Sequence, residues 1–307
     1  MKPVPRILAL AAAALVTSLG TAAPLRILYF TKSSGYEHSV IKVTDGKPSH
    51  SGNILAALAA RNDWTVTASK DGSRFAPDYL RQFDVVIFYT SGDLLAVGTD
   101  GEPAMTAAGK QALLDSVRAG LGFVALHSGT DTFHTHEHGG GNPANRGPRY
   151  RNYGDEADPY VRMIGGEFIK HGPQQRAAAR VVAPDFPGFG GLGLEVRTME
   201  EWYTLKEFAP DDHVLLVMQT AGMKGGDYAR PDYPLAWVRR YGKGRVAVNA
   251  MGHREDVWDS PAYQAMLVGM IGWAGGRVAA DITPNLEKAA PGHATLQPEP
   301  AGKPDGK

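Results

Sequence analysis

The stretch GFVALHSG, residues 122–129, decides the fold of this 307-residue chain. Its first five residues are apolar or glycine with no polar face, which is typical of a strand buried on both sides in a parallel sheet. His127 follows directly, and Gly129 leaves space for a tight turn. The pattern therefore predicts a strand at Gly122–Leu126 that ends in an elbow, with the side chain of His127 exposed at the sheet edge.

The turn after this strand also admits simpler interpretations. Ser128 is a second candidate nucleophile, although the spacing of an elbow favours His127. An ordinary strand–helix turn would use Thr130 or Asp131 as a helix cap and would carry no chemistry. A functional elbow and a plain turn therefore both remain open.

Other apolar runs have the same character as the first. Most are β-branched or aromatic and are bounded by Gly, Pro or Asp, so they predict buried strands at Leu25–Phe30, 64–68, 84–89, 213–219 and 245–250. Apolar residues at helical spacing lie between them and predict helices at 51–60, 104–119 and Pro261–Ala274. Strands that alternate with helices predict one domain, residues 24–280, built on a doubly wound α/β sheet.

Three segments interrupt this alternation. Residues 128–160 are rich in Gly, His, Asn and Arg and predict a long loop, which in a compact domain is usually functional or mobile. Residues 184–193 form a second irregular stretch, rich in Gly and Pro. Residues 281–307 contain few apolar residues, so we expect a disordered C-terminal tail.

The N-terminus has the order of a secretory signal peptide. Lys2 and Arg6 precede an apolar run at 7–19, and small residues follow up to Ala23. This order predicts a signal peptide at residues 1–23, cleaved after Ala22 or Ala23, and hence a periplasmic or secreted protein. An uncleaved N-terminal anchor is the alternative.

Composition excludes several classes of function. Lys and Arg total 32 and Asp and Glu total 32, so the formal net charge is zero. This balance removes the electrostatic argument for nucleic acid or for an anionic membrane as a partner. The chain has no cysteine, which excludes disulfides, thiolate metal ligands and a cysteine nucleophile.

Histidines follow three of the predicted strands. His38 comes after the first strand, His127 after the strand at 122–126, and His253 after the run at 245–250. Ligands of open α/β sheets bind outside the carboxyl ends of the strands, so these side chains could share one crevice. Imidazole can serve there as acid, base or metal ligand. Each histidine taken alone is equally compatible with a loop or capping role.

Two further groups contain residue types that carry chemistry. His134, His136 and His138 alternate and would face one way on an extended segment, so they could hold an ion, although a solvated loop fits equally well. Glu200 and Glu201 precede Trp202 and Tyr203, which sets carboxylates beside aromatic rings. Consecutive residues face different ways, so we expect only one of the two acids to act; both could also be exposed surface acids.

These motifs together resemble the ThuA-like family, which is associated with trehalose utilisation. The resemblance runs from about residue 25 to 277. It rests on TKSSGYEH at 31–38, GFVALHSGTDT at 122–132, IGGEFIKH at 164–171, EWY at 201–203, PLAW at 234–237, GKGRV at 242–246, GH at 252–253 and WAGG at 273–276. The chain departs from the family at Gly172, where proline is frequent, and in the His-rich insert at 134–147.

The resemblance implies a fold similar to class I glutamine amidotransferases, a flavodoxin-like and mostly parallel sheet. In those enzymes the elbow holds a catalytic cysteine. Here His127 stands at that position, so thiol-based amide hydrolysis is excluded. The implied substrates are trehalose-type disaccharides, used through 3-keto-sugar intermediates.

Two functions of different classes follow. The first is an enzyme that acts on a sugar or keto-sugar, with catalytic residues His127, Glu201 and His253 and substrate-binding residues His38, Thr130, Asp131, His171 and Tyr203. The second is a non-catalytic carbohydrate-binding protein on the same fold. In both cases the expected partner is a small-molecule carbohydrate. No cofactor is required by the motifs, but the histidines could hold a divalent metal such as zinc.

Overall fold

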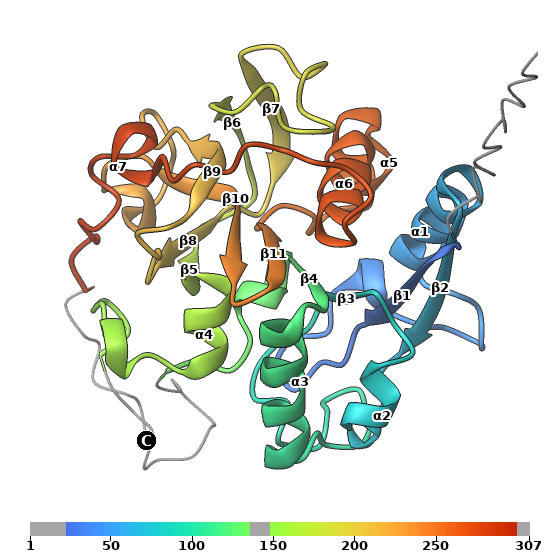
Figure 1. The fold of residues 1–307 in the computed structure, drawn as a ribbon. Helices are drawn as coiled ribbons and strands as arrows, with labels where there is room; N and C mark the ends of the chain where they lie inside the picture. The colour runs from blue at the N-terminus through green and yellow to red at the C-terminus, as the bar shows by residue number, and fades with distance from the viewer. Residues whose placement is uncertain (1–22, 136–147, 300–307) are drawn as a thin grey trace, which may run out of the picture.

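The computed structural model describes residues 23–135 and 148–299. Within them a central sheet of nine strands is covered by helices on both faces (Figure 1). The strand order is β2-β1-β3-β4-β11-β10-β9-β6-β7. A separate pair, β5 (Glu167–His171) and β8 (Tyr203–Lys206), is antiparallel.

One half of the sheet is parallel. It consists of β2 (Trp64–Ser69), β1 (Leu25–Phe30), β3 (Val85–Phe88), β4 (Gly122–Leu126) and β11 (Gly244–Asn249). The order 2-1-3-4 followed by a fifth strand is that of flavodoxin-like folds. The doubly wound α/β prediction is therefore confirmed. The carboxyl ends of β1, β4 and β11 lie at one edge, which is where the candidate residues were expected.

The other half of the sheet is antiparallel and was not foreseen in full. It adds β10 (Tyr233–Tyr241), β9 (His213–Met218), β6 (Gln175–Val181) and β7 (Glu195–Glu200). Through these strands the chain returns, at the end of β7, to the edge of the sheet where β1, β4 and β11 end. The residue that follows β7 is Glu201.

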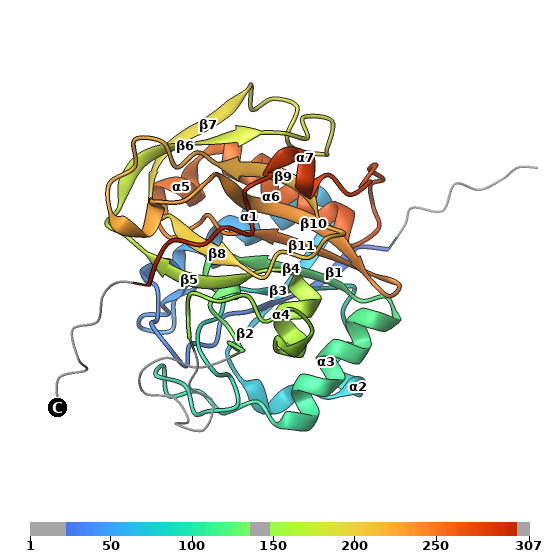
Figure 2. The same ribbon diagram turned by 90° about the vertical axis from the view of Figure 1, so that its left-hand side faces the viewer.

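The helices form two layers, one on each face of the sheet. On one face lie α1 (His50–Asn62), α5 (Glu255–Asp259) and α6 (Pro261–Ala274); on the other lie α2 (Pro77–Leu80), α3 (Ala107–Ala119) and α4 (Pro159–Ile164) (Figure 2). Side-chain caps determine where the two longest helices of the N-terminal half begin. Ser49 accepts a hydrogen bond from the backbone of Gly52, and Thr106 accepts one from Gly109.

The core is continuous across both halves of the sheet. Strands β3 and β4 are buried along their whole length, as their uninterrupted apolar sequence predicts. The tryptophans Trp202, Trp237 and Trp258 are fully buried, and Nε1 of Trp237 on β10 donates to the carbonyl of Ile164 at the end of α4. No helix within residues 23–135 and 148–299 is long and apolar enough to span a bilayer.

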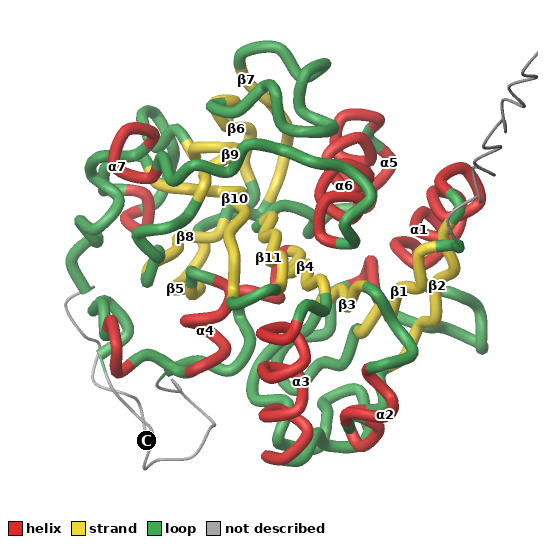
Figure 3. Tube along the Cα trace, in the orientation of Figure 1, coloured by secondary structure: helices red, strands yellow, loops and turns green. Residues whose placement is uncertain are grey.

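The C-terminal tail differs from the expectation of disorder. After α6 the chain crosses the molecule as a long loop and forms α7 (Leu286–Ala289), which residues 290–299 follow (Figures 1 and 3). Leu286 and Ala289 are buried against β9, and Asn285 accepts a hydrogen bond from the backbone of Val214. A few apolar residues at helical spacing cover this strand, so low overall hydrophobicity was a poor guide for residues 281–299. The predicted signal peptide lies, up to residue 22, outside the described residues.

Candidate functional site

Four side chains from distant parts of the sequence meet at the carboxyl edge of the parallel strands. His38 follows β1, His127 follows β4, His253 follows β11, and Glu201 follows β7. One ligand atom from each lies within 4.8 Å of the others. The sheet therefore brings the three histidines together, as the positions of the strand ends suggest, and adds one carboxylate. We call this group the His–Glu cluster.

The backbone at the end of β4 has the geometry of an elbow. His127 has a φ of 43°, which is rare for a residue other than glycine. The next residues form a tight turn at His127–Thr130. Gly129 is necessary there, since a Cβ atom would lie 2.9 Å from the carbonyl oxygen of Phe88. The hydroxyl of Tyr160 donates to the Gly129 carbonyl at 2.8 Å and holds the turn against α4.

The ring of His127 is fixed by one hydrogen bond. Its Nδ1 lies 3.0 Å from the carbonyl oxygen of Ala250, which can only accept. Nδ1 therefore carries the proton, and Nε2 presents a lone pair to the cluster. The ring of Tyr203 packs against the same imidazole, with ring centroids 4.0 Å apart.

Glu201 is the common neighbour of the surrounding imidazoles. Its Oε2 lies 2.9 Å from Nδ1 of His253 and 3.7 Å from Nε2 of His127. Its Oε1 lies 3.3 Å from Nδ1 of His171. His38 closes the group, with its ring centroid 4.9 Å from that of His127 and 5.1 Å from that of His253. Nε2 of His38 lies 3.4 Å from the hydroxyl of Tyr203.

Burial sets the charges of the cluster. It lowers the pKa of His38 to about 2, with the neighbouring His127 and His253 acting in the same direction. Burial also lowers the pKa of His127, against the opposing effect of Glu201. Burial acts to raise the pKa of Glu201, but the neighbouring imidazoles of His127 and His253 outweigh it and hold that pKa well below its usual range. His38 and His127 are therefore neutral at pH 7 and Glu201 is an anion.

Three nitrogens of the cluster are buried without a hydrogen-bond partner among the described residues. They are Nδ1 of His38, Nε2 of His127 and Nδ1 of His253. Nδ1 of His253 is close to Glu201, but the angles are not those of a hydrogen bond. Buried polar atoms are normally satisfied, so this geometry favours an additional group between them. Three imidazoles and one carboxylate form a donor set that suits zinc.

The expected substrate-binding residues take different places around the cluster. Tyr203 lies within it, and His171 lies at its rim with a side chain that is 43% exposed and stacked on Tyr203. Asp131 lies nearby and pairs with His134. Thr130 is fully buried, and its hydroxyl donates to the carbonyl of His127 at 2.8 Å. This bond places Thr130 in the support of the elbow, and nothing in the geometry favours substrate contact for it.

His134 belongs to a second, structural network. Its Nε2 lies 2.6 Å from a carboxylate oxygen of Asp131, and its Nδ1 lies 2.9 Å from one of Glu167. Lys206 approaches the other Glu167 oxygen at 3.5 Å. Both nitrogens of His134 are thus occupied, so it has no lone pair for an ion. His136 and His138, the other members of the predicted metal motif, lie outside the described residues.

Glu200 is the residue whose part the sequence analysis missed. It is fully buried, and its Oε1 accepts hydrogen bonds from the backbone of Gly252 at 3.3 Å and of His253 at 2.6 Å. Burial raises its pKa to about 8. Glu200 therefore holds the turn that presents His253, while Glu201 faces the ring of the same histidine. Two consecutive acids at the end of a strand face opposite ways, and this alternation could have indicated that Glu200 has a role of its own.

The departure from the family motif at Gly172 has a local explanation. The backbone N–H of Gly172 donates to the hydroxyl of Tyr228 at 2.9 Å, a bond that proline could not make. A Cβ atom at this position would also lie 2.7 Å from the Tyr228 ring. Tyr228 in turn donates to the carbonyl of Trp202, next to Glu201.

The chain is similar to known proteins in both sequence and fold. Residues 26–274 match the sequence profile of the family described as ThuA, trehalose utilisation. A solved ThuA-like protein from Bacteroides uniformis is 18% identical, with a TM-score of 0.58 over 83% of this chain and 93% of that chain. One from Parabacteroides merdae is also 18% identical, with a TM-score of 0.55 over 87% and 96%. No curated protein matches the sequence.

Proposed function

This chain belongs to the ThuA, or trehalose utilisation, family, and from that premise we propose that it is an enzyme acting on a sugar or keto-sugar at the His–Glu cluster. The substrate class is a trehalose-type disaccharide or its 3-keto form. One observation carries the proposal: three buried imidazole nitrogens without hydrogen-bond partners among the described residues surround one ionised carboxylate. Such an arrangement is costly to maintain in a purely structural role.

The cluster fits a divalent cation such as zinc. His38, His127, His253 and Glu201 would be the ligands, since each can offer one atom toward the same point. The Nδ1–H bond of His127 to Ala250 is the kind of outer contact that orients a ligating imidazole. A bound ion would polarise a carbonyl or hydroxyl oxygen of the sugar.

The residues around the cluster have different roles in the metal-free and the metal-bound site. Without an ion, the lone pair of His127 Nε2 can accept a proton from the sugar, and Glu201 stabilises the imidazolium that results. With the cluster engaged as ligands, His171 is the group that can carry a proton, because it is half-exposed and touches Glu201. Tyr203 offers a ring for stacking and keeps His38 in place.

The experiment combines metal analysis with product detection. Untagged protein is analysed for bound metal, then incubated with disaccharides and their 3-keto forms, with and without EDTA, and products are followed by mass spectrometry. We expect a stoichiometric divalent ion and turnover that EDTA removes. His127→Ala should lose about 10²–10⁴-fold in rate, while His213→Ala, outside the site on β9, should behave as wild type.

The other outcomes decide between the alternatives. Turnover without a bound ion would make His127 itself the acid/base group. Saturable sugar binding with no product over long incubation would identify a carbohydrate-binding protein instead. Full activity of His127→Ala would remove the cluster as the site.

We also propose that the mature protein acts outside the cytoplasm. The support is the basic, apolar and small-residue order of residues 1–23. Expression in a Gram-negative host, followed by fractionation and N-terminal sequencing, tests it. A mature N-terminus at residue 23 or 24 in the periplasmic fraction is expected. Unprocessed protein in the cytoplasm would contradict the proposal.

A further inference from the structure

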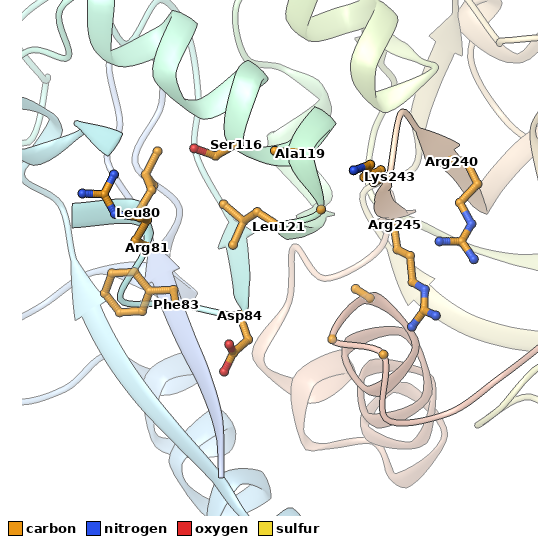
Figure 4. A pocket seen from close by; sticks show the side chains of 14 residues that line it. Leu80, Arg81, Phe83, Asp84, Ser116, Ala119, Leu121, Arg240, Lys243 and Arg245 are labelled. Carbon is orange, nitrogen blue, oxygen red and sulfur yellow. The ribbon is translucent and has the colours of Figure 1, made fainter. Parts of the chain in front are cut away.

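A concave site lies at the edge of the sheet opposite the His–Glu cluster. It is a cavity of about 570 Å³ at the amino ends of β3, β4 and β11, between the ends of α3 and α6 (Figure 4). Ligands of open α/β sheets normally bind at the other edge, so this cavity is not explained by the fold. Its volume lies within the range of small-molecule sites.

One wall of the cavity is cationic. The hairpin of β10 and β11 contributes Arg240, Lys243 and Arg245, which Figure 4 shows on one side of the cavity. Arg240 and Arg245 are directly opposite each other in the antiparallel pair. Within residues 23–135 and 148–299 none of the three forms an ion pair. Burial, and then the charge of Arg240, lower the pKa of Arg245.

The lining acid does not compensate this charge. Asp84 is the carboxylate of the cavity, and it already accepts two hydrogen bonds from the side chain of Arg26, at 2.7 and 3.1 Å. Like charges placed together without a counter-charge raise the energy of the empty site. The wall therefore favours an anion.

Capping of a helix end explains the position of only one of the three cations. Arg245 Nη1 donates to the carbonyl of Trp273 at 3.0 Å, which satisfies the end of α6, as cations near helix C-termini often do. Among the residues that the structure describes, the side chain of Arg240 interacts favourably with the ring of Trp273 alone, with its guanidinium carbon 5.9 Å from the ring centroid. Lys243 is exposed and makes no side-chain bond within the described residues. Two of the three cations thus have no helix end to cap.

The opposite wall is mainly apolar. Leu80, Phe83 and Leu121 line it, and Figure 4 shows them across the cavity from the hairpin. Arg81 also lies on this side, and its guanidinium pairs with Asp78. A free inorganic ion would use only the cationic wall. A ligand that combines an oxyanion with a compact organic body would use both, because arginine binds phosphate, sulfate or carboxylate while the body covers apolar surface.

We propose that this cavity binds a compact organic oxyanion, with the anionic group held by Arg240 and Lys243 and the body on the apolar wall. The site is independent of the His–Glu cluster and does not rest on the function proposed for it. Because the chain as a whole has no net charge, binding here depends on local charge and should weaken as ionic strength rises.

Calorimetry on the full-length mature protein tests the proposal. The protein is treated with EDTA, so that anions do not bind a metal, and titrated at low salt with glucose 6-phosphate, glucuronate, inorganic phosphate and glucose. The test variant is Arg240→Gln/Lys243→Gln. The control is Lys42→Gln/Arg61→Gln, which removes the same charge from exposed residues away from the cavity.

We expect saturable binding of glucose 6-phosphate or glucuronate, no binding of glucose, and an affinity that is roughly tenfold lower in the test variant. The phosphate and carboxylate ligands distinguish which oxyanion is preferred. The control should bind as wild type. Equal binding by both variants, binding of inorganic phosphate alone, or no saturable binding would each overturn the proposal.

Discussion

His127 holds a backbone conformation that its side chain does not favour. Residues in sparsely populated regions of φ cost on the order of 1–3 kcal/mol, and they persist where the surroundings hold them firmly. Here Gly129, Tyr160 and the Ala250 carbonyl do so. The strain aims Nε2 at Glu201, which is why a histidine at the end of a strand becomes part of a cluster.

Glu200 should act as a positioning residue for His253. Glu200→Ala removes the acceptor of two backbone hydrogen bonds, so the turn at 252–253 loosens and zinc affinity should fall about 10–100-fold. Glu200→Gln keeps an oxygen that can accept both bonds and should retain most of the affinity. Zinc titration of both variants, with melting temperatures, checks this. Equal losses in the two variants would contradict a role that depends on these hydrogen bonds.

At the scale of elements, the network around His134 connects the loop after β4 to the β5–β8 pair. Burial acts to lower the pKa of His134, but hydrogen bonds to Asp131 and Glu167 raise it to about 9. A folded-state pKa above the ordinary value of 6.5 means that protonation stabilises the folded state. This contribution is fully present below pH 6.5 and is lost as pH rises through about 9.

Denaturant unfolding at several pH values measures this contribution. His134→Gln should lower the free energy of unfolding by about 1–3 kcal/mol near pH 6, and by less near pH 10, where the wild-type histidine is neutral. Asp78→Asn is a suitable control, because within the described residues its carboxylate pairs with exposed Arg81 alone. A penalty for His134→Gln that does not change with pH would contradict the assigned charge.

The sequence predicted the parallel half of the sheet because those strands are buried on both faces. Runs such as Val85–Phe88 and Gly122–Leu126 contain no polar residue. The strands β6 (QRAAARV) and β7 (EVRTME) lie at the far edge, carry charged residues on a half-exposed face, and resemble loops in composition. Strand β10 begins with a Tyr–Pro pair, which weakens its strand signal.

The His–Glu cluster shows the same contrast between the parallel half of the sheet, which the sequence predicts, and the antiparallel half, which it does not. His38, His127 and His253 follow parallel strands, whose carboxyl ends share an edge by topology alone. Glu201 arrives from the antiparallel half, and the register of β7 decides that Glu201 faces the imidazoles while Glu200 faces the backbone. That register depends on long-range pairing, so the residue pattern alone predicts only that one acid acts. Glu201 was named after the family resemblance had brought in the EWY block at 201–203.

For the whole molecule, the cluster joins four segments that lie far apart in the sequence. An ion bound there should stabilise the entire fold, because the unfolded chain has no such site. Zinc at 100 times its Kd would add about 2.7 kcal/mol to the free energy of unfolding. Thermal unfolding with and without zinc should show a higher Tm for wild type and none of this gain for His127→Ala. An equal rise in both proteins would place the ion elsewhere.

The separation of these ligands along the chain also has a kinetic consequence. His38 comes from the beginning of the domain, and His253 follows β11, the last strand to be synthesised. The four members of the cluster lie far apart in the sequence, and contacts between distant segments form slowly. The capacity to capture an ion should therefore appear late in refolding, after helix formation and after the burial of tryptophan. Any ion that the protein carries is thus acquired by the finished fold, from whatever metals surround the chain at that moment.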